Sequence, residues 1–132
     1  MSDLSYAVQL AQKLIRCPSI TPEEAGTLDL LEAELTQLGF NCIRLAFGDG
    51  KDRIDNLYAE FGEGPAHFAF AGHVDVVPVG RLEDWQFNPF QAEISDGFLY
   101  GRGAADMKSG LLHLFQQSGS GKNPQRNIQK LA

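Results

Sequence analysis

The stretch HFAFAGHVDVVPVG constrains the fold more than any other part of the sequence. Its apolar run, Phe68–Ala71, is short and nearly unbroken, which is typical of a strand buried inside a sheet. Gly72 follows, and then a histidine and an aspartate two residues apart, His73 and Asp75. We therefore predict a central strand over residues 67–73 that ends beside two polar side chains.

Two segments before this strand show the periodicity of amphipathic helices, residues 3–16 and residues 22–38. Their apolar positions are Leu4, Val8, Ala11 and Ile15 in the first segment and Leu28, Leu31, Leu35 and Leu38 in the second. Pro18 ends the first helix. For the second helix, the residue types predict Thr21 as the cap, Pro22 at the first helical position, Glu24 as the reciprocal capping residue and Gly39 at the end.

Strand signals follow these helices. Alternating apolar residues predict strands over 40–47 and 56–61, joined by the turn FGDGKD. The stretch QAEISDGFLY predicts a hairpin that turns at Asp96-Gly97, and GRGAADMKSGLLHLF predicts a glycine loop that leads into a helix. The whole pattern indicates an α/β fold in which helices pack on a mixed β-sheet of 40–47, 56–61 and the central strand.

Composition narrows the function classes. The net charge of −6 argues against a nucleic-acid partner, which requires a basic face. No apolar run approaches the roughly 20 residues of a membrane span, and the first residues lack the pattern of a secretory leader, so we expect a cytoplasmic protein without a membrane partner. Cys17 and Cys42 are expected to be reduced core thiols rather than a disulfide.

Three polar residues carry the chemistry. In an extended chain His73 and Asp75 face the same side, and a metal-binding histidine needs an acceptor for its second ring N–H. The alternative is a strand-end histidine beside a capping aspartate. Asp106 follows two glycines where a helix is expected to begin, so the helix dipole would keep it ionised, as a metal ligand must be. The alternative for Asp106 is a plain helix N-cap.

Taken together, GHVDVVPVG, the following W and PF, and DGFLYGRGAADMKSG resemble the dinuclear zinc desuccinylase, deacetylase and aminoacylase family over about residues 4–115. CPSITPEEAG, DNLYAEFG and GRGAADMKSG are similar to its branch that hydrolyses N-succinyl-diaminopimelate in lysine and cell-wall biosynthesis. The resemblance implies a zinc-peptidase-like catalytic domain with His73 as a ligand of one zinc and Asp106 bridging two. It implies that Asp75 orients His73 and counts among the catalytic residues, and that the peptide bond from Asp106 to Met107 is cis.

The resemblance also implies cofactors and partners. Two zinc ions are expected, with cobalt as a possible substitute, together with a small-molecule substrate and, for full-length members, a homodimer. The family's adjacent Glu-Glu pair, a further acidic ligand and a final histidine lie downstream in its pattern. After Asp106 this sequence has no Asp or Glu, and its one later histidine is His113.

We therefore expect residues 1–117 to be the amino-terminal part of the catalytic domain of a truncated or frameshifted chain. Residues 118–132, with three basic and no acidic residues and no apolar period, are expected to be a disordered tail outside the family pattern. The 132 residues alone are expected to be inactive. An acetylornithine deacetylase or dipeptidase relative, or a non-enzymatic fragment, stays open as an alternative.

Overall fold

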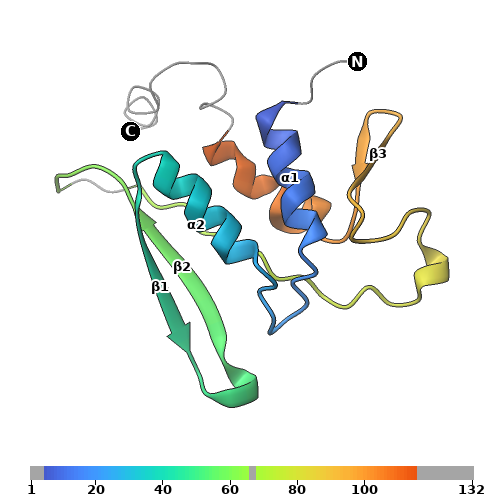
Figure 1. Ribbon diagram of the computed structural model, residues 1–132, viewed down its shortest axis with the longest axis horizontal. Helices are drawn as coiled ribbons and strands as arrows, with labels where there is room; N and C mark the ends of the chain where they lie inside the picture. The colour runs from blue at the N-terminus through green and yellow to red at the C-terminus, as the bar shows by residue number, and fades with distance from the viewer. Residues whose placement is uncertain (1–4, 66–67, 116–132) are drawn as a thin grey trace. The chain divides into compact units, whose positions relative to one another are not determined.

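The computed structural model describes residues 5–65 and 68–115 (Figure 1). The chain forms two compact units. The first unit contains residues 5–16 and 79–115, and the second contains residues 17–78 without the gap at 66–67. Each unit is described by itself below. Within the described part of the chain, no helix is long and apolar enough to cross a membrane.

Helix α1, Tyr6–Arg16, is the centre of the first unit. It confirms the predicted helix and ends before Pro18, as expected, whereas Leu4 lies outside the described residues. The buried stripe differs in detail from the predicted one, because Val8 is only half-buried. The stripe consists of Ala7, Leu10, Ala11, Leu14 and Ile15.

A hairpin and a short helix complete the first unit. Strands β3, Glu93–Ser95, and β4, Phe98–Tyr100, pair antiparallel and turn at Asp96-Gly97, as predicted. Both turn residues have positive φ angles, 50° and 82°, as a tight two-residue hairpin requires. A short 3-10 helix, Gly110–Leu114, contacts α1.

The second unit contains helix α2, Thr27–Gln37, which begins later than its capping signals predict. Ala25 and Gly26 have positive φ angles, 51° and 86°, so the chain cannot be helical there. The predicted start at Thr21 and Pro22 is therefore wrong. Glu24 does cap the helix, because its carboxylate accepts a hydrogen bond from the amide of Leu28 (2.9 Å).

The end of α2 agrees with the prediction. Gly39 has a φ of 89°, and the amide of Phe40 donates to the carbonyl of Leu35 at 3.0 Å. This is the closing bond of a Schellman motif, which favours glycine in the left-handed position. The buried residues of the helix include Leu28, Leu31 and Leu35 of the predicted stripe.

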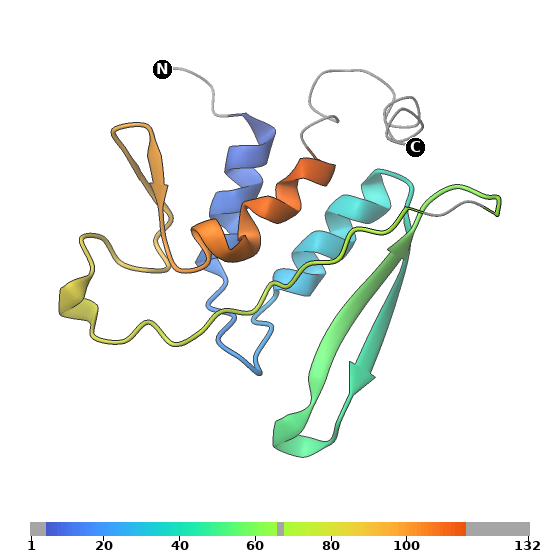
Figure 2. The same ribbon diagram turned by 180° about the vertical axis from the view of Figure 1, so that it is seen from behind.

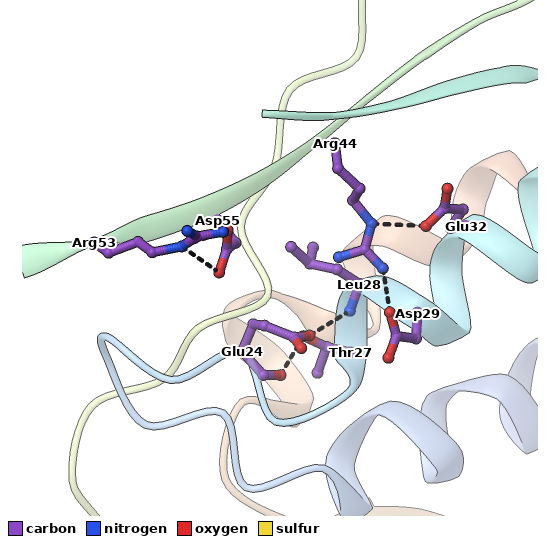
Figure 3. Close-up of polar contacts among 8 residues, drawn as sticks. All are labelled: Glu24, Thr27, Leu28, Asp29, Glu32, Arg44, Arg53 and Asp55. Atoms are coloured by element: carbon purple, nitrogen blue, oxygen red, sulfur yellow. Dashed lines mark hydrogen bonds and ion pairs between the residues drawn. The ribbon is translucent and has the colours of Figure 1, made fainter. Parts of the chain in front are cut away.

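Helix α2 contacts an antiparallel pair of strands, β1 (Asn41–Phe47) and β2 (Ile54–Glu60). Arg44 on β1 joins the two elements, since its guanidinium donates to Glu32 at 2.7 Å and also to Asp29 (Figure 3). Burial acts to lower the pKa of Arg44, but these two hydrogen bonds outweigh it and raise the pKa above its ordinary value.

Strands β1 and β2 confirm the two predicted strands, although β2 starts two residues earlier than predicted.

The predicted central strand is wrong for this structure. Residues 68–73 are exposed and form no strand, and Figure 2 shows them as a long extended trace. Among the described residues the sheets are two separate antiparallel pairs, β1–β2 and β3–β4, rather than one mixed sheet. An apolar run becomes a strand only when neighbours accept and donate its backbone hydrogen bonds. The α/β class is confirmed, whereas the mixed sheet is not.

One face of the β1–β2 pair is apolar and exposed. Residues paired across the strands share a face, and Ile43 pairs with Tyr58 and Phe47 with Ile54. Their exposed fractions run from 40% at Ile54 to 63% at Phe47. The opposite face, which contains Arg44 and its partner Leu57, is turned toward α2. The predicted apolar face of β1 is therefore real, but it does not pack on α2.

This arrangement predicts opposite outcomes for two identical substitutions. Leu45→Lys, on the exposed face, should change the free energy of unfolding by less than about 0.5 kcal/mol and reduce self-association of the chain. Leu57→Lys, on the α2 face, should cost about 1–3 kcal/mol, because it forces a charge against the helix. Urea unfolding and sedimentation velocity measure the two effects. Equal destabilisation by both substitutions would contradict the assigned faces.

Cys17 and Cys42 are reduced thiols, as predicted, and each is only half-buried rather than part of the core.

Candidate metal centre

The segment that carries His73 and Asp75 is held by a second segment far away in the sequence. The amide of Val76 donates to the carbonyl of Ser19 (2.9 Å), and the amide of Thr21 donates to the carbonyl of Val76 (3.2 Å). The Ser19 hydroxyl also donates to the carbonyl of Val74 (2.7 Å). Ser19 and Val76 are buried, with 0% and 4% of their surface exposed. These three bonds fix the backbone on both sides of Asp75.

His73 and Asp75 lie side by side on this backbone. The Nδ1 atom of His73 is 3.0 Å from the main-chain oxygen of Asp75 and 3.2 Å from its Oδ1. A carbonyl oxygen can only accept, so Nδ1 is the protonated nitrogen. In the neutral ring Nε2 then keeps its lone pair, which is the form that binds a metal. The two side chains are about half exposed, 47% and 49%.

Asp106 lies in the first unit, on a wide turn over Ala104–Lys108. The amide of Lys108 donates to Gly103 (2.9 Å) and that of Ser109 to Ala104 (3.3 Å), each bond spanning five residues. Asp106 itself is extended, with φ −126° and ψ 98°, and it is exposed. The peptide bond between Asp106 and Met107 is cis, as the resemblance implies.

The expected helix start at Asp106 is wrong. The 3-10 helix begins at Gly110, and its N-cap residue is Ser109, three positions later. The reason is the wide turn, whose extended residues separate the glycine loop from the helix. A plain helix N-cap therefore does not describe Asp106.

One contact holds the wide turn against α1, and Gly101, shortly before the turn, lies close to the same helix. The Lys108 side chain is fully buried, and its Nζ donates to the carbonyl of Leu14 at 2.8 Å. This carbonyl belongs to the last turn of α1, where carbonyls lack helical partners and a cation is favoured. At Gly101, an added Cβ would come within 2.5 Å of the Cγ2 atom of Ile15, so only glycine fits.

Sequence reasoning missed Lys108, because a lone lysine is normally exposed. Its position three and four residues before the apolar residues Leu111 and Leu112 was the available signal. Trp85 is a half-buried loop residue. Its indole N–H donates to the carbonyl of Val79 (2.9 Å), and the guanidinium of Arg102 lies 5.0 Å from its ring centroid.

The structure brings together two of the three predicted site residues, His73 and Asp75. Asp106 lies in the other unit, and its joint action with His73 stays a prediction. Within residues 5–65 and 68–115, no group of three or more His, Cys, Asp or Glu side chains is placed to hold a metal ion. The donor atoms of His73 and Asp106 are nevertheless of the types that zinc prefers, imidazole nitrogen and carboxylate oxygen.

These features define an α/β region in which a carboxylate orients a histidine, as carboxylates do for metal-binding histidines. The model of peptidase family M20/M25/M40 matches residues 69–128. Over this range the chain is similar to this family. The matched range overlaps the predicted tail, and the division at residue 117 stays a prediction because residues 116–132 lie outside the described part.

Several curated relatives are named succinyl-diaminopimelate desuccinylase. The protein of Parvibaculum lavamentivorans is 57% identical over 103 residues, which are 77% of this chain and 26% of the relative. The protein of Rhodospirillum centenum is 53% identical over 114 residues, 86% of this chain and 30% of the relative. The chain thus spans between a quarter and a third of the length of these relatives.

A solved structure is similar as well. The crystal structure of human carnosine dipeptidase 1 superimposes with a TM-score of 0.67 at 27% identity, over 82% of this chain and 26% of that one. The likeness supports the α/β class of an incomplete catalytic domain.

Proposed function

We propose that these 132 residues form the amino-terminal part of the catalytic domain of a succinyl-diaminopimelate desuccinylase. The reaction is the hydrolysis of N-succinyl-LL-2,6-diaminopimelate to succinate and LL-2,6-diaminopimelate, a cytoplasmic step of lysine and diaminopimelate biosynthesis. The identity of 50–57% to several proteins of that name carries the proposal. The dipeptidase likeness is weaker, at 27% identity, so it does not favour a dipeptidase.

In this proposal His73 and Asp106 would hold zinc. Zinc, when bound, lowers the pKa of a water molecule and polarises the substrate carbonyl. His73 contributes its Nε2 lone pair, because Nδ1 is held by Asp75. Asp75 keeps the ring in one tautomer and one orientation. Asp106 contributes an exposed carboxylate from its extended position in the wide turn.

The 132 residues alone should not catalyse the reaction. Two protein ligands are fewer than the three of a typical catalytic zinc site, and Asp106 is the last acidic residue of the sequence. The proton acceptor implied by the resemblance is therefore not among them, and such a group is worth about 10²–10⁴-fold in rate.

The test is a hybrid enzyme in which this chain replaces the matching region of the Parvibaculum lavamentivorans desuccinylase. We expect the purified chain with zinc to release no succinate from N-succinyl-diaminopimelate. We expect the hybrid to retain most of the parent's kcat/KM. A hybrid that folds like the parent and holds metal, but releases no succinate, would contradict the proposed function.

A further inference from the structure

A hydrogen bond to Asp75 comes from Thr21, a residue that the sequence pattern suggested only as a helix cap and to which the comparisons assign no role. The Thr21 hydroxyl donates to Oδ2 of Asp75 at 2.6 Å. The other carboxylate oxygen, Oδ1, lies 3.2 Å from Nδ1 of His73. Both oxygens of one carboxylate are therefore engaged in a chain that runs from Thr21 through Asp75 to His73.

The backbone places this hydroxyl with little freedom. The amide of Thr21 donates to the carbonyl of Val76, and the amide of Val76 donates back to Ser19. Ile20 and Val76 form a parallel bridge at the same point. Because the Ser19 hydroxyl also donates to the carbonyl of Val74, the two segments are joined on both sides of Asp75, although Thr21 and Asp75 are 54 residues apart in the sequence.

The geometry indicates a task for this bond. A carboxylate at the end of a half-exposed side chain can rotate about its χ2 angle, which is broad and weakly restrained. A donor on Oδ2 restricts that rotation and leaves Oδ1 aimed at the ring of His73. Since Nδ1–H then has two acceptors, the Asp75 main-chain oxygen and Oδ1, the tautomer with an unprotonated Nε2 is favoured.

We propose that Thr21 is a positioning residue, whose hydroxyl fixes the Asp75 carboxylate and through it holds His73 in the tautomer with an unprotonated Nε2, the form that binds a metal. The proposal rests on the proposed function only for the last step, the use of Nε2 by a metal. The arrangement of the three side chains can be tested without metal or activity.

The experiment measures the ¹⁵N chemical shifts of the two ring nitrogens of His73 in the metal-free 132-residue chain. In the wild type we expect a protonated Nδ1 and an unprotonated Nε2. Thr21→Val keeps the shape and the main-chain amide but removes the hydroxyl. It should shift the tautomer ratio toward the Nε2–H form by about two- to tenfold, the effect of one typical net hydrogen bond.

Two variants sharpen the result. Thr21→Ser restores a hydroxyl and should return the shifts to wild-type values. Thr36→Val removes a threonine hydroxyl on α2, close to the sulfur of Cys42, and should leave the His73 shifts unchanged. The proposal is overturned if Thr21→Val gives the wild-type spectrum, or if Thr21→Ser moves the shifts as far as Thr21→Val does.

A second measurement separates this inference from the proposed function. In the hybrid enzyme, Thr21→Val should weaken zinc binding, and Thr21→Ser should recover it. An inactive hybrid would contradict the desuccinylase assignment and leave the tautomer result standing. An unchanged tautomer in an active hybrid would overturn the role of Thr21 alone.

Discussion

Replacement of His73 by alanine in the hybrid enzyme is expected to lower kcat/KM by more than about 100-fold. Loss of a partner that only orients a metal-binding histidine already costs about 10–100-fold in affinity or activity, and loss of the ligand itself removes the metal–nitrogen bond. Steady-state assays of succinate release with excess zinc measure the effect. The matched control is His67→Ala, which removes a histidine of the same stretch without a role in the proposed site.

Two further variants test the order of the roles. Asp106→Asn keeps the size of the side chain but removes the charge that holds metal, so its loss should equal that of His73→Ala. Asp75→Asn should cost less, about 10–100-fold, because it disturbs the orientation of His73 and leaves the ligand in place. An Asp75 variant that is more damaging than the His73 variant would contradict the assignment of His73 as the ligand.

Replacement of Lys108 by alanine should be the most destabilising of the single substitutions considered. Lys108 is fully buried, so truncation leaves a cavity, and for side chains of similar length such a truncation costs about 2–5 kcal/mol. It also leaves the carbonyl of Leu14 without the Nζ donor at 2.8 Å. The free energy of unfolding of the 132-residue chain, measured in urea, should fall by this amount.

Two controls separate packing from hydrogen bonding at Lys108. Lys108→Met keeps most of the volume and removes the donor, so it should cost about 1–3 kcal/mol, the penalty of an unsatisfied buried group. Lys13→Ala removes an exposed lysine from the last turn of α1, next to Leu14, and should change the free energy of unfolding little. A Lys108→Ala variant as stable as Lys13→Ala would show that the contact with Leu14 does not hold the wide turn.

Local signals predicted the local parts of this fold. Helix α1 ends before Pro18, α2 ends at Gly39, and the β3–β4 hairpin turns at Asp96-Gly97, because each depends on a few neighbouring residues. The predicted start of α2 is wrong, and one of the two reasons is a contact far away in the sequence. The hydroxyl of Thr21 binds Asp75 instead of capping a helix, and the left-handed Ala25 and Gly26 delay the first turn.

The prediction of a central strand is wrong because its evidence came from one segment alone. The apolar run at Phe68–Ala71 shows that the segment can be a strand, but strand formation depends on partners elsewhere, and none of the described residues pairs with it. The same limit applies to Lys108, whose burial results from a contact 94 residues away.

The candidate site likewise has one part that the sequence predicted and another that it could not predict. The two-residue spacing of His73 and Asp75 predicted a side-chain pair, and the structure places them in contact. Their connection to Thr21 could not be predicted, because it crosses 54 residues of sequence. The pairing of His73 with Asp106 comes from the motif resemblance, and it remains a prediction about two separate units.

The most direct test of the central claim is anomalous X-ray scattering at the zinc edge from crystals of the hybrid enzyme grown with zinc. The account predicts one zinc at ~2.0–2.2 Å from Nε2 of His73 and from a carboxylate oxygen of Asp106, with a second zinc on the other oxygen of Asp106. Nδ1 of His73 should still face Asp75. Zinc bound in an active hybrid with neither His73 nor Asp106 among its ligands would contradict the account.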